Sequence, residues 1–121
     1  MGVVQRFQGG VAFDEPPKFR TASGLTAHAG GGQASALQLT GSGASIGTVG
    51  TAADSVKLPI AKAGKVFFLA NDAAAHSMQV FGKGTDTINN VATATGVAQA
   101  AGVSALYFCV IDGNWGRVQS S

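Results

Sequence analysis

The stretch LYFCVIDGNWGRV, residues 106–118, is the clearest indication of the fold. Two runs rich in aromatic and β-branched residues flank the turn sequence Asp112-Gly113-Asn114. An Asp-Gly pair readily adopts the positive φ angles of a tight turn, so the stretch predicts a β-hairpin. We therefore expect strands to build the chain around it.

Two earlier segments also have the pattern of strands. Branched aliphatic residues alternate with other residues over 55–60, which predicts a half-buried strand. Because Pro59 cannot donate a hydrogen bond to a ladder, we expect this strand at a sheet edge. Residues 66–70, VFFLA, form a continuous apolar run, which predicts a central strand buried on both faces.

About eight such strands, separated by turn residues, predict an all-β fold, either a small antiparallel β-sandwich or a jelly-roll-like barrel. A length of 121 residues suits one domain, and 12% charged with 45% hydrophobic residues excludes intrinsic disorder. We assign residues 23–121 to this β-sandwich domain. Residues 1–22 are expected to form an extended N-terminal arm or a first strand, because they are unusually apolar for a free tail.

The long segment from Thr21 to Ala53 contains no Asp, Glu, Lys or Arg. One interpretation is a glycine-rich surface loop with two short strands. The other is an ordered segment that neighbouring subunits cover, where unpaired charges would be costly to desolvate. The sequence leaves both open.

The charge distribution and the apolar pattern exclude several classes of partner. Eight basic residues are scattered and the formal net charge is +2, so we expect no nucleic acid partner. No apolar run is long enough to span a membrane, and the start of the chain lacks the apolar core of a signal peptide, so we expect no membrane partner and synthesis in a host cytoplasm. The single cysteine, Cys109, cannot form an intrachain disulfide and is expected to be inert within an apolar strand.

Residues 43–47, GASIG, match the G-x-S-x-G pattern of a hydrolase nucleophile, and Asp54, Asp72 and His76 follow Ser45 in the order of a catalytic triad. That motif requires a helix directly after the serine, whereas residues 48–52 are a poor helix and the chain is short for such a fold. We therefore predict a turn between strands, and no catalytic residues.

Metal and cofactor sites are not expected. The possible ligands His28, His76 and Cys109 lack the close spacing of a metal site, and the glycine runs fit neither a P-loop nor a dinucleotide-binding motif. The carboxylates that lie at predicted strand ends or turns are expected to accept hydrogen bonds from nearby backbone amides; these are Asp54, Asp72, Asp86 and Asp112.

Several segments together resemble small virion structural proteins of tailed bacteriophages, in particular head decoration, or cement, proteins. The segments are residues 23–33, residues 53–59, Met78–Phe81 with Asp86–Asn89, and Phe108-Cys109 with Gly113–Trp115. The resemblance extends over about Gly24 to Val118 and does not include residues 1–22.

The resemblance implies a non-enzymatic protein without cofactor. It would bind the major capsid protein of the same phage on the outer surface of the mature head, act as a homotrimer, and brace the shell against internal DNA pressure. The alternatives are a phage tail, fibre or spike component, and a carbohydrate-binding β-module that uses Trp115 or Tyr107. The candidate capsid or subunit interface residues are Val3, Val4, Phe7, Val11, Phe13, Phe19, Leu25 and Trp115.

Overall fold

The computed structural model describes residues 19–120, and this part of the chain contains ten strands and no helix. The strands are β1 (Thr21–Thr26), β2 (Leu37–Gln38), β3 (Gly43–Thr48), β4 (Ser55–Lys57), β5 (Val66–Asn71), β6 (Met78–Phe81), β7 (Thr87–Ile88), β8 (Val97–Gln99), β9 (Ser104–Ile111) and β10 (Asn114–Gln119).

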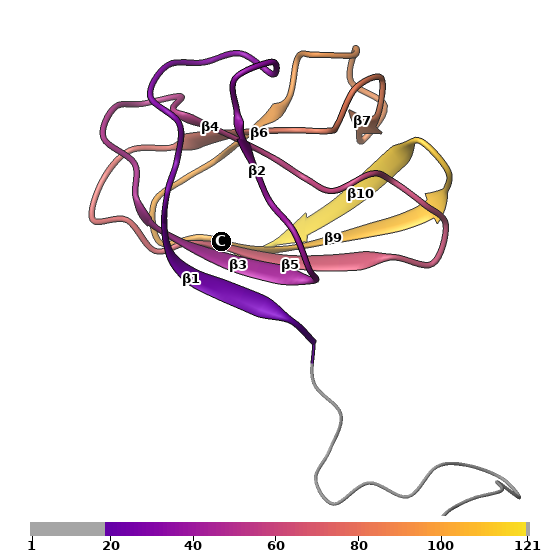
Figure 1. Cartoon of the computed structure of the whole chain (residues 1–121), viewed down its shortest axis with the longest axis horizontal. Coiled ribbons are helices and arrows are strands. Elements are labelled where there is room, and N and C mark those ends of the chain that lie inside the picture. The colour runs from indigo at the N-terminus through magenta and orange to yellow at the C-terminus, as the bar shows by residue number, and fades with distance from the viewer. Residues whose placement is uncertain (1–18, 121) are drawn as a thin grey trace, which may run out of the picture.

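The strands form two sheets, and the chain passes from one to the other at nearly every step. The six-stranded sheet has the order β1-β3-β5-β9-β10-β7, and the four-stranded sheet has the order β2-β4-β6-β8. Strands β1, β3 and β5 pair in parallel, and so do β2, β4 and β6. The first six strands therefore wind as stacked coils of a β-solenoid, whose two layers are visible in Figure 1.

The last strands return in the opposite direction and close the stack. Strand β9 pairs antiparallel with β5, and β8 pairs antiparallel with β6. Strands β9 and β10 form the hairpin predicted from residues 106–118, with Gly113 in its turn at a φ of 90°. The all-β prediction is confirmed, whereas the antiparallel sandwich or jelly-roll-like barrel is wrong, because the coils stack in parallel.

The parallel pairing follows from the length of the connections between β1, β3 and β5, because each connection crosses to the other sheet and back. The coils begin at Thr21, Gly43 and Val66, so successive coils are nearly equal in length. An antiparallel hairpin needs only a short turn, whereas a parallel partner requires a crossover of a dozen or more residues. Here each crossover contains the short strand of the other sheet. The uncharged segment Thr21–Ala53 thus forms most of the first two coils.

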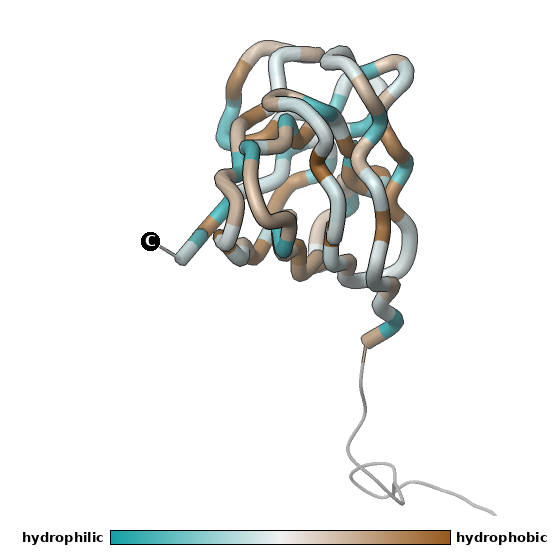
Figure 2. The backbone as a smooth tube through the Cα atoms, turned by 90° about the vertical axis from the view of Figure 1, so that its left-hand side faces the viewer, coloured by the Kyte–Doolittle hydropathy of each residue, from teal (hydrophilic) through white to brown (hydrophobic). Residues whose placement is uncertain are grey.

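The core lies between the two sheets, where alternate residues of each strand point inward. Figure 2 shows hydrophobic and hydrophilic residues alternating closely along the chain. The largest inward side chains come from the centre of the six-stranded sheet, where Phe67, Tyr107 and Trp115 are all fully buried. They pack with Leu58, Met78 and other apolar residues of the opposite layer.

Two details of the strand predictions are wrong. Strand β4 lies inside the four-stranded sheet rather than at its edge, and it ends at Lys57, so Pro59 breaks no ladder bond. Strand β5 is not buried on both faces: Phe67 and Leu69 point into the core, whereas Phe68 is 42% exposed. The continuous apolar run reflects an apolar outer face, not a second covered face.

The neighbouring residues Phe67 and Phe68 give a matched test of this orientation. We expect Phe67→Ala to cost about 3–5 kcal/mol of unfolding free energy, because it leaves a cavity in the core. Phe68→Ala removes a ring that is already partly in water, and we expect it to cost about 1 kcal/mol. Denaturant unfolding of both variants measures the difference. Equal losses would contradict the inward direction of Phe67 and the outward direction of Phe68.

A buried polar network joins the two sheets where the parallel coils meet the returning strands. The Gln99 side chain donates to the carbonyl oxygens of Leu69 and Val103, both at 2.9 Å, and accepts from the Tyr107 hydroxyl at 2.8 Å. The side-chain amide of Asn71 donates to the backbone carbonyl oxygens of Gln99 at 2.9 Å and His76 at 3.1 Å. Asn71, Gln99 and Tyr107 are fully buried, so the network holds strands β5, β8 and β9 in one alignment.

Tyr107 provides a spectroscopic test of the network, because it is the single tyrosine of the chain. Burial raises the pKa of Tyr107 to about 12. The folded state therefore holds this proton more tightly than the unfolded state, and stability is lost as pH rises from about 10 towards 12. We expect tyrosinate absorbance to appear well above pH 10 in the folded protein, and Tyr107→Phe to weaken the alkaline loss of stability. Tyrosinate absorbance that appears near pH 10 in the folded protein would contradict the buried, hydrogen-bonded position of Tyr107.

Candidate docking surface

The outer face of the six-stranded sheet, which points away from the core, is apolar and exposed. Strand register places Phe68 beside Leu106, and Leu106 beside Val118; it also places Val66 beside Phe108. Phe68 is 42% exposed and Val118 is 61% exposed. Exposed apolar patches of this kind commonly mark interaction sites.

Glycines and small residues shape this face. The Phe108 ring lies across Gly116 on the neighbouring strand, where an added Cβ would come within 2.6 Å of the ring. Ser45, Ala70 and Ser104 lie side by side across β3, β5 and β9. Because their side chains are short beside Phe68 and Leu106, the face is hollowed there.

This outer hollow has a volume of about 470 Å³. Its lining residues come from four adjacent strands and carry no ionisable side chain; they are Thr21, Ala22, Ser23, Ala44, Ser45, Phe68, Leu69, Ala70, Ser104, Ala105 and Leu106. The uncharged segment from Thr21 supplies one side of it. A hollow of this size that is lined by no ionisable side chain suits apolar side chains of a partner. Of its four hydroxyl groups, that of Ser45 is engaged by Asp72, which leaves those of Thr21, Ser23 and Ser104 for a partner.

The structure brings together only part of the triad suggested by the sequence. The Ser45 hydroxyl donates to the Asp72 carboxylate at one end of the outer hollow. His76 is exposed in the connection between β5 and β6, at a φ of 77°, and among the described residues its side chain makes no hydrogen bond to Ser45 or Asp72. A serine that is hydrogen-bonded to a carboxylate, without a histidine between the two, does not form the serine–histidine pair that activates the nucleophile of a catalytic triad.

The G-x-S-x-G segment also lacks the local geometry of a nucleophile elbow. Residues 43–47 lie within strand β3, which continues to Thr48, and no helix follows in the described chain. The predicted turn at this place is therefore wrong as well. Ser45 is a strand residue whose side chain points out of the sheet.

Substitution of Ser45 and His76 tests whether they are passive. We expect Ser45→Ala to lower stability by no more than about 1 kcal/mol, because its hydrogen bond is partly solvated, and His76→Ala by about 0.5 kcal/mol. A panel of chromogenic esters should be hydrolysed equally slowly by the wild type and both variants. Hydrolysis that Ser45→Ala abolishes would establish a nucleophile.

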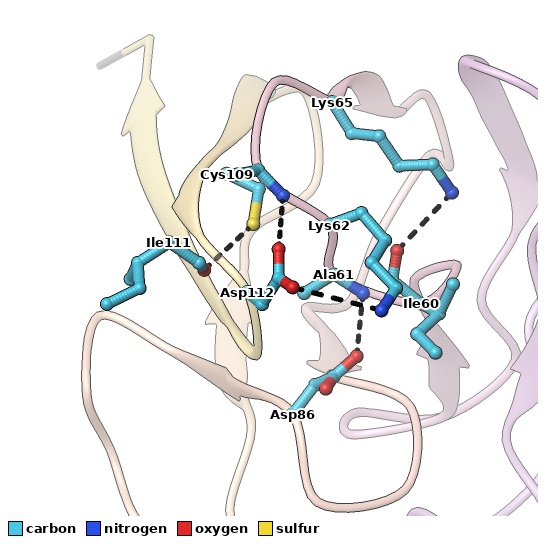
Figure 3. A network of polar contacts seen from close by, with 9 residues as sticks. Ile60, Ala61, Lys62, Lys65, Asp86, Cys109, Ile111 and Asp112 are labelled. Atoms are coloured by element: carbon cyan, nitrogen blue, oxygen red, sulfur yellow. Dashed lines mark hydrogen bonds and ion pairs between the residues drawn. The ribbon is translucent and has the colours of Figure 1, made fainter.

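Three of the four carboxylates are held by backbone amides, as expected, but the amides come mostly from segments distant in sequence; the Thr51 amide on Asp54 is the one nearby partner among them. Asp86 is buried and accepts from the Ala61 amide at 2.7 Å, and Asp112 accepts from the Ala63 amide at 2.9 Å. Figure 3 shows both carboxylates fixing the connection before β5 to the hairpin side of the molecule. Asp72 differs, because its partner is the Ser45 hydroxyl.

Asp54 is held by two backbone amides. It accepts from the amides of Gly30 and Thr51, both at 3.0 Å. The hydrogen bond from Gly30 is the main reason that the pKa of Asp54 lies below its ordinary value. Asp54 therefore ties the start of β4 to the preceding coil, a structural role.

The possible metal ligands do not come together. Within residues 19–120, no group of three His, Cys, Asp or Glu side chains is arranged to hold a metal ion. Cys109 is buried and its thiol donates to the Ile111 carbonyl oxygen at 3.1 Å. The same residues include no helix long and apolar enough to cross a membrane.

The candidate interface residues fall into three groups. Phe19 is 57% exposed, and its ring centroid lies 5.2 Å from that of Phe68 on the outer face. Leu25 is half-buried against the core, and Trp115 is fully buried, so the fold places Trp115 in the core and not on a surface. The other five lie outside the described residues: Val3, Val4, Phe7, Val11 and Phe13.

Sequence reasoning missed Ala70, Ser104 and Leu106, which lie in the outer hollow. Each is ordinary in sequence, and only the register of β5 and β9 brings them together. The sequence did contain one signal that could have found them. In a strand every second residue lies on the same face, so the residues on the outer face can be read off within 66–70 and 104–110 once these are recognised as strands.

Comparisons with protein-family models, with curated proteins and with solved structures returned no match for this chain. The resemblance to phage virion proteins gains no support from them. The function of the protein must therefore be inferred from its own geometry and from the sequence segments that resemble virion proteins.

Proposed function

We propose that this chain is a non-enzymatic assembly protein that docks on the outer surface of a phage head as a homotrimer and braces the shell. The apolar outer face of the six-stranded sheet, with a hollow that is lined by no ionisable side chain, is the observation that carries this proposal. Docking of this face on another protein would bury few charged groups, and burial of unpaired charges is what would oppose docking. The sequence resemblance to decoration proteins supplies the identity of the proposed partner, the major capsid protein.

The architecture suits a bracing role. Parallel coils closed by a hairpin present the docking face on a sheet in which each of the strands β3, β5, β9 and β10 pairs with a neighbour on both sides. The buried network around Gln99 fixes that sheet to the second layer. A stiff face loses little conformational entropy when it docks, which favours binding.

The two rival functions differ in what they need from the structure. A tail, fibre or spike component would use the same face, and location in the virion separates it from a head protein. A carbohydrate-binding module was expected to use Trp115 or Tyr107, but both rings are fully buried. Neither ring is available to stack on a sugar.

A charge placed in the outer hollow tests the docking face. We expect Ala70→Asp to fold and to lose at least about tenfold in affinity for purified, expanded heads of the phage, because docking would bury an unpaired carboxylate. The matched control is Ala92→Asp, the same change at an exposed residue between β7 and β8. Cosedimentation measures binding, and circular dichroism checks the fold of each variant.

Three results would contradict the proposal. They are failure of the wild-type protein to bind heads, unchanged binding by Ala70→Asp, and location of the protein on the tail by electron microscopy. Light scattering of the isolated protein should give the mass of three chains. A stable monomer at micromolar concentration would remove the homotrimer from the proposal.

A further inference from the structure

We infer that a second cavity, at the place where strands β3 and β5 begin, binds a small carboxylate with an apolar body. The second cavity has a volume of about 240 Å³ and shares no lining residue with the outer hollow. Its wall comes from the residues just before β3, from the start of β5, from Pro59 after β4 and from Trp115 of β10. Because a cavity of about 150 Å³ is large enough for a ring the size of benzene, the second cavity admits such a ring with a small substituent.

The indole nitrogen of Trp115 is the observation that points to a ligand. Trp115 is fully buried, and within residues 19–120 its Nε1 is the single buried side-chain nitrogen or oxygen without a hydrogen-bond partner. A buried donor without an acceptor is costly, and the neighbouring buried amides of Asn71 and Gln99 are all paired. Since Trp115 lines the second cavity, an acceptor brought there by a ligand would complete the hydrogen bonding of the core.

The second cavity has a mobile side and a fixed side. Phe19 and Lys65 are exposed, whereas Phe67 and Trp115 are fully buried and form the inner wall. Exposed side chains change rotamer within nanoseconds, so Phe19 and Lys65 can give way while the inner wall stays in place. A ligand therefore reaches the indole N–H from the side of Phe19 and Lys65.

The polar groups of the second cavity favour an anion. Lys65 is its one ionisable lining residue, and the Lys65 ammonium donates to the Ile60 carbonyl oxygen over a long 3.4 Å (Figure 3). An ammonium has three N–H donors, so it retains donors for a ligand. An indole N–H and an ammonium only donate, whereas a carboxylate only accepts. A carboxylate thus complements both groups, and an apolar body would pack against Pro59 and Phe67.

The indole N–H resonance of Trp115 tests this inference directly, because the chain contains a single tryptophan. Benzoate is titrated into the isotope-labelled full chain at neutral pH, and proton–nitrogen correlation spectra are recorded. We expect the one indole peak to move downfield and to saturate, with a dissociation constant of about 1 mM, because so small a ligand makes few contacts. An indole peak that stays in place throughout the titration would overturn the inference.

Substitution of Lys65 tests the recognition of the carboxylate. We expect Lys65→Gln to weaken benzoate binding about fivefold, because a charge-assisted hydrogen bond is lost. Benzamide, which has the same ring and an uncharged acceptor, should bind Lys65→Gln and the wild type alike. The matched control is Lys83→Gln, which removes an exposed lysine that lines neither the second cavity nor the outer hollow. Equal benzoate affinities of Lys65→Gln and Lys83→Gln would overturn the assignment of a carboxylate.

A variant of the outer hollow separates the two sites. Ala70→Asp places a carboxylate in the outer hollow and leaves every residue of the second cavity unchanged. We expect it to bind benzoate with wild-type affinity and with the same movement of the indole peak, and circular dichroism checks its fold. Loss of benzoate binding in folded Ala70→Asp would place the ligand in the outer hollow and would overturn the inference. Head binding plays no part in these measurements, so they stand or fall apart from the proposed function.

Discussion

Gln99 is the residue on which the arrangement of the two sheets depends. Its amide donates to carbonyl groups at Leu69 and Val103, and its oxygen accepts from Tyr107. Strand β8 belongs to the four-stranded sheet, whereas β5 and β9 belong to the six-stranded sheet. An apolar residue at 99 could slide along the facing layer, but a fully buried glutamine keeps its hydrogen bonds in only one alignment. The cost of leaving a buried amide unpaired therefore selects that alignment.

This network also explains where the fold changes from parallel to antiparallel pairing. Asn71 ends β5, the last strand of the parallel coils in its sheet, and its amide reaches Gln99 at the end of β8. The returning strand β9 then pairs against β5. Coils that only stack in parallel leave an open end, and here the returning hairpin covers it with Tyr107 and Trp115.

Strands were predictable from the sequence, but their partners were not. Alternation within residues 106–118 reports which residues share a face, and it is the same for parallel and antiparallel neighbours. The nearly equal spacing of the coil starts was the available signal for a solenoid. Ser45 and Phe19 stood out in the sequence, whereas Ala70 and Ser104 did not, because pairing alone brings them into the outer hollow. Gln99 was missed for a similar reason, since it lies in an Ala- and Thr-rich segment without a clear period.

The edges of the six-stranded sheet indicate why association should use its face. Strand β1 is one edge, and its pairing with β3 is irregular around Leu25, next to Gly24 at a φ of 69°. The other edge, β7, is only two residues long. Short or irregular edges are poor templates for adding a strand from another chain. Within the described residues, the broad apolar outer face around Phe68 and Leu106 is therefore the surface of this sheet best suited to a partner.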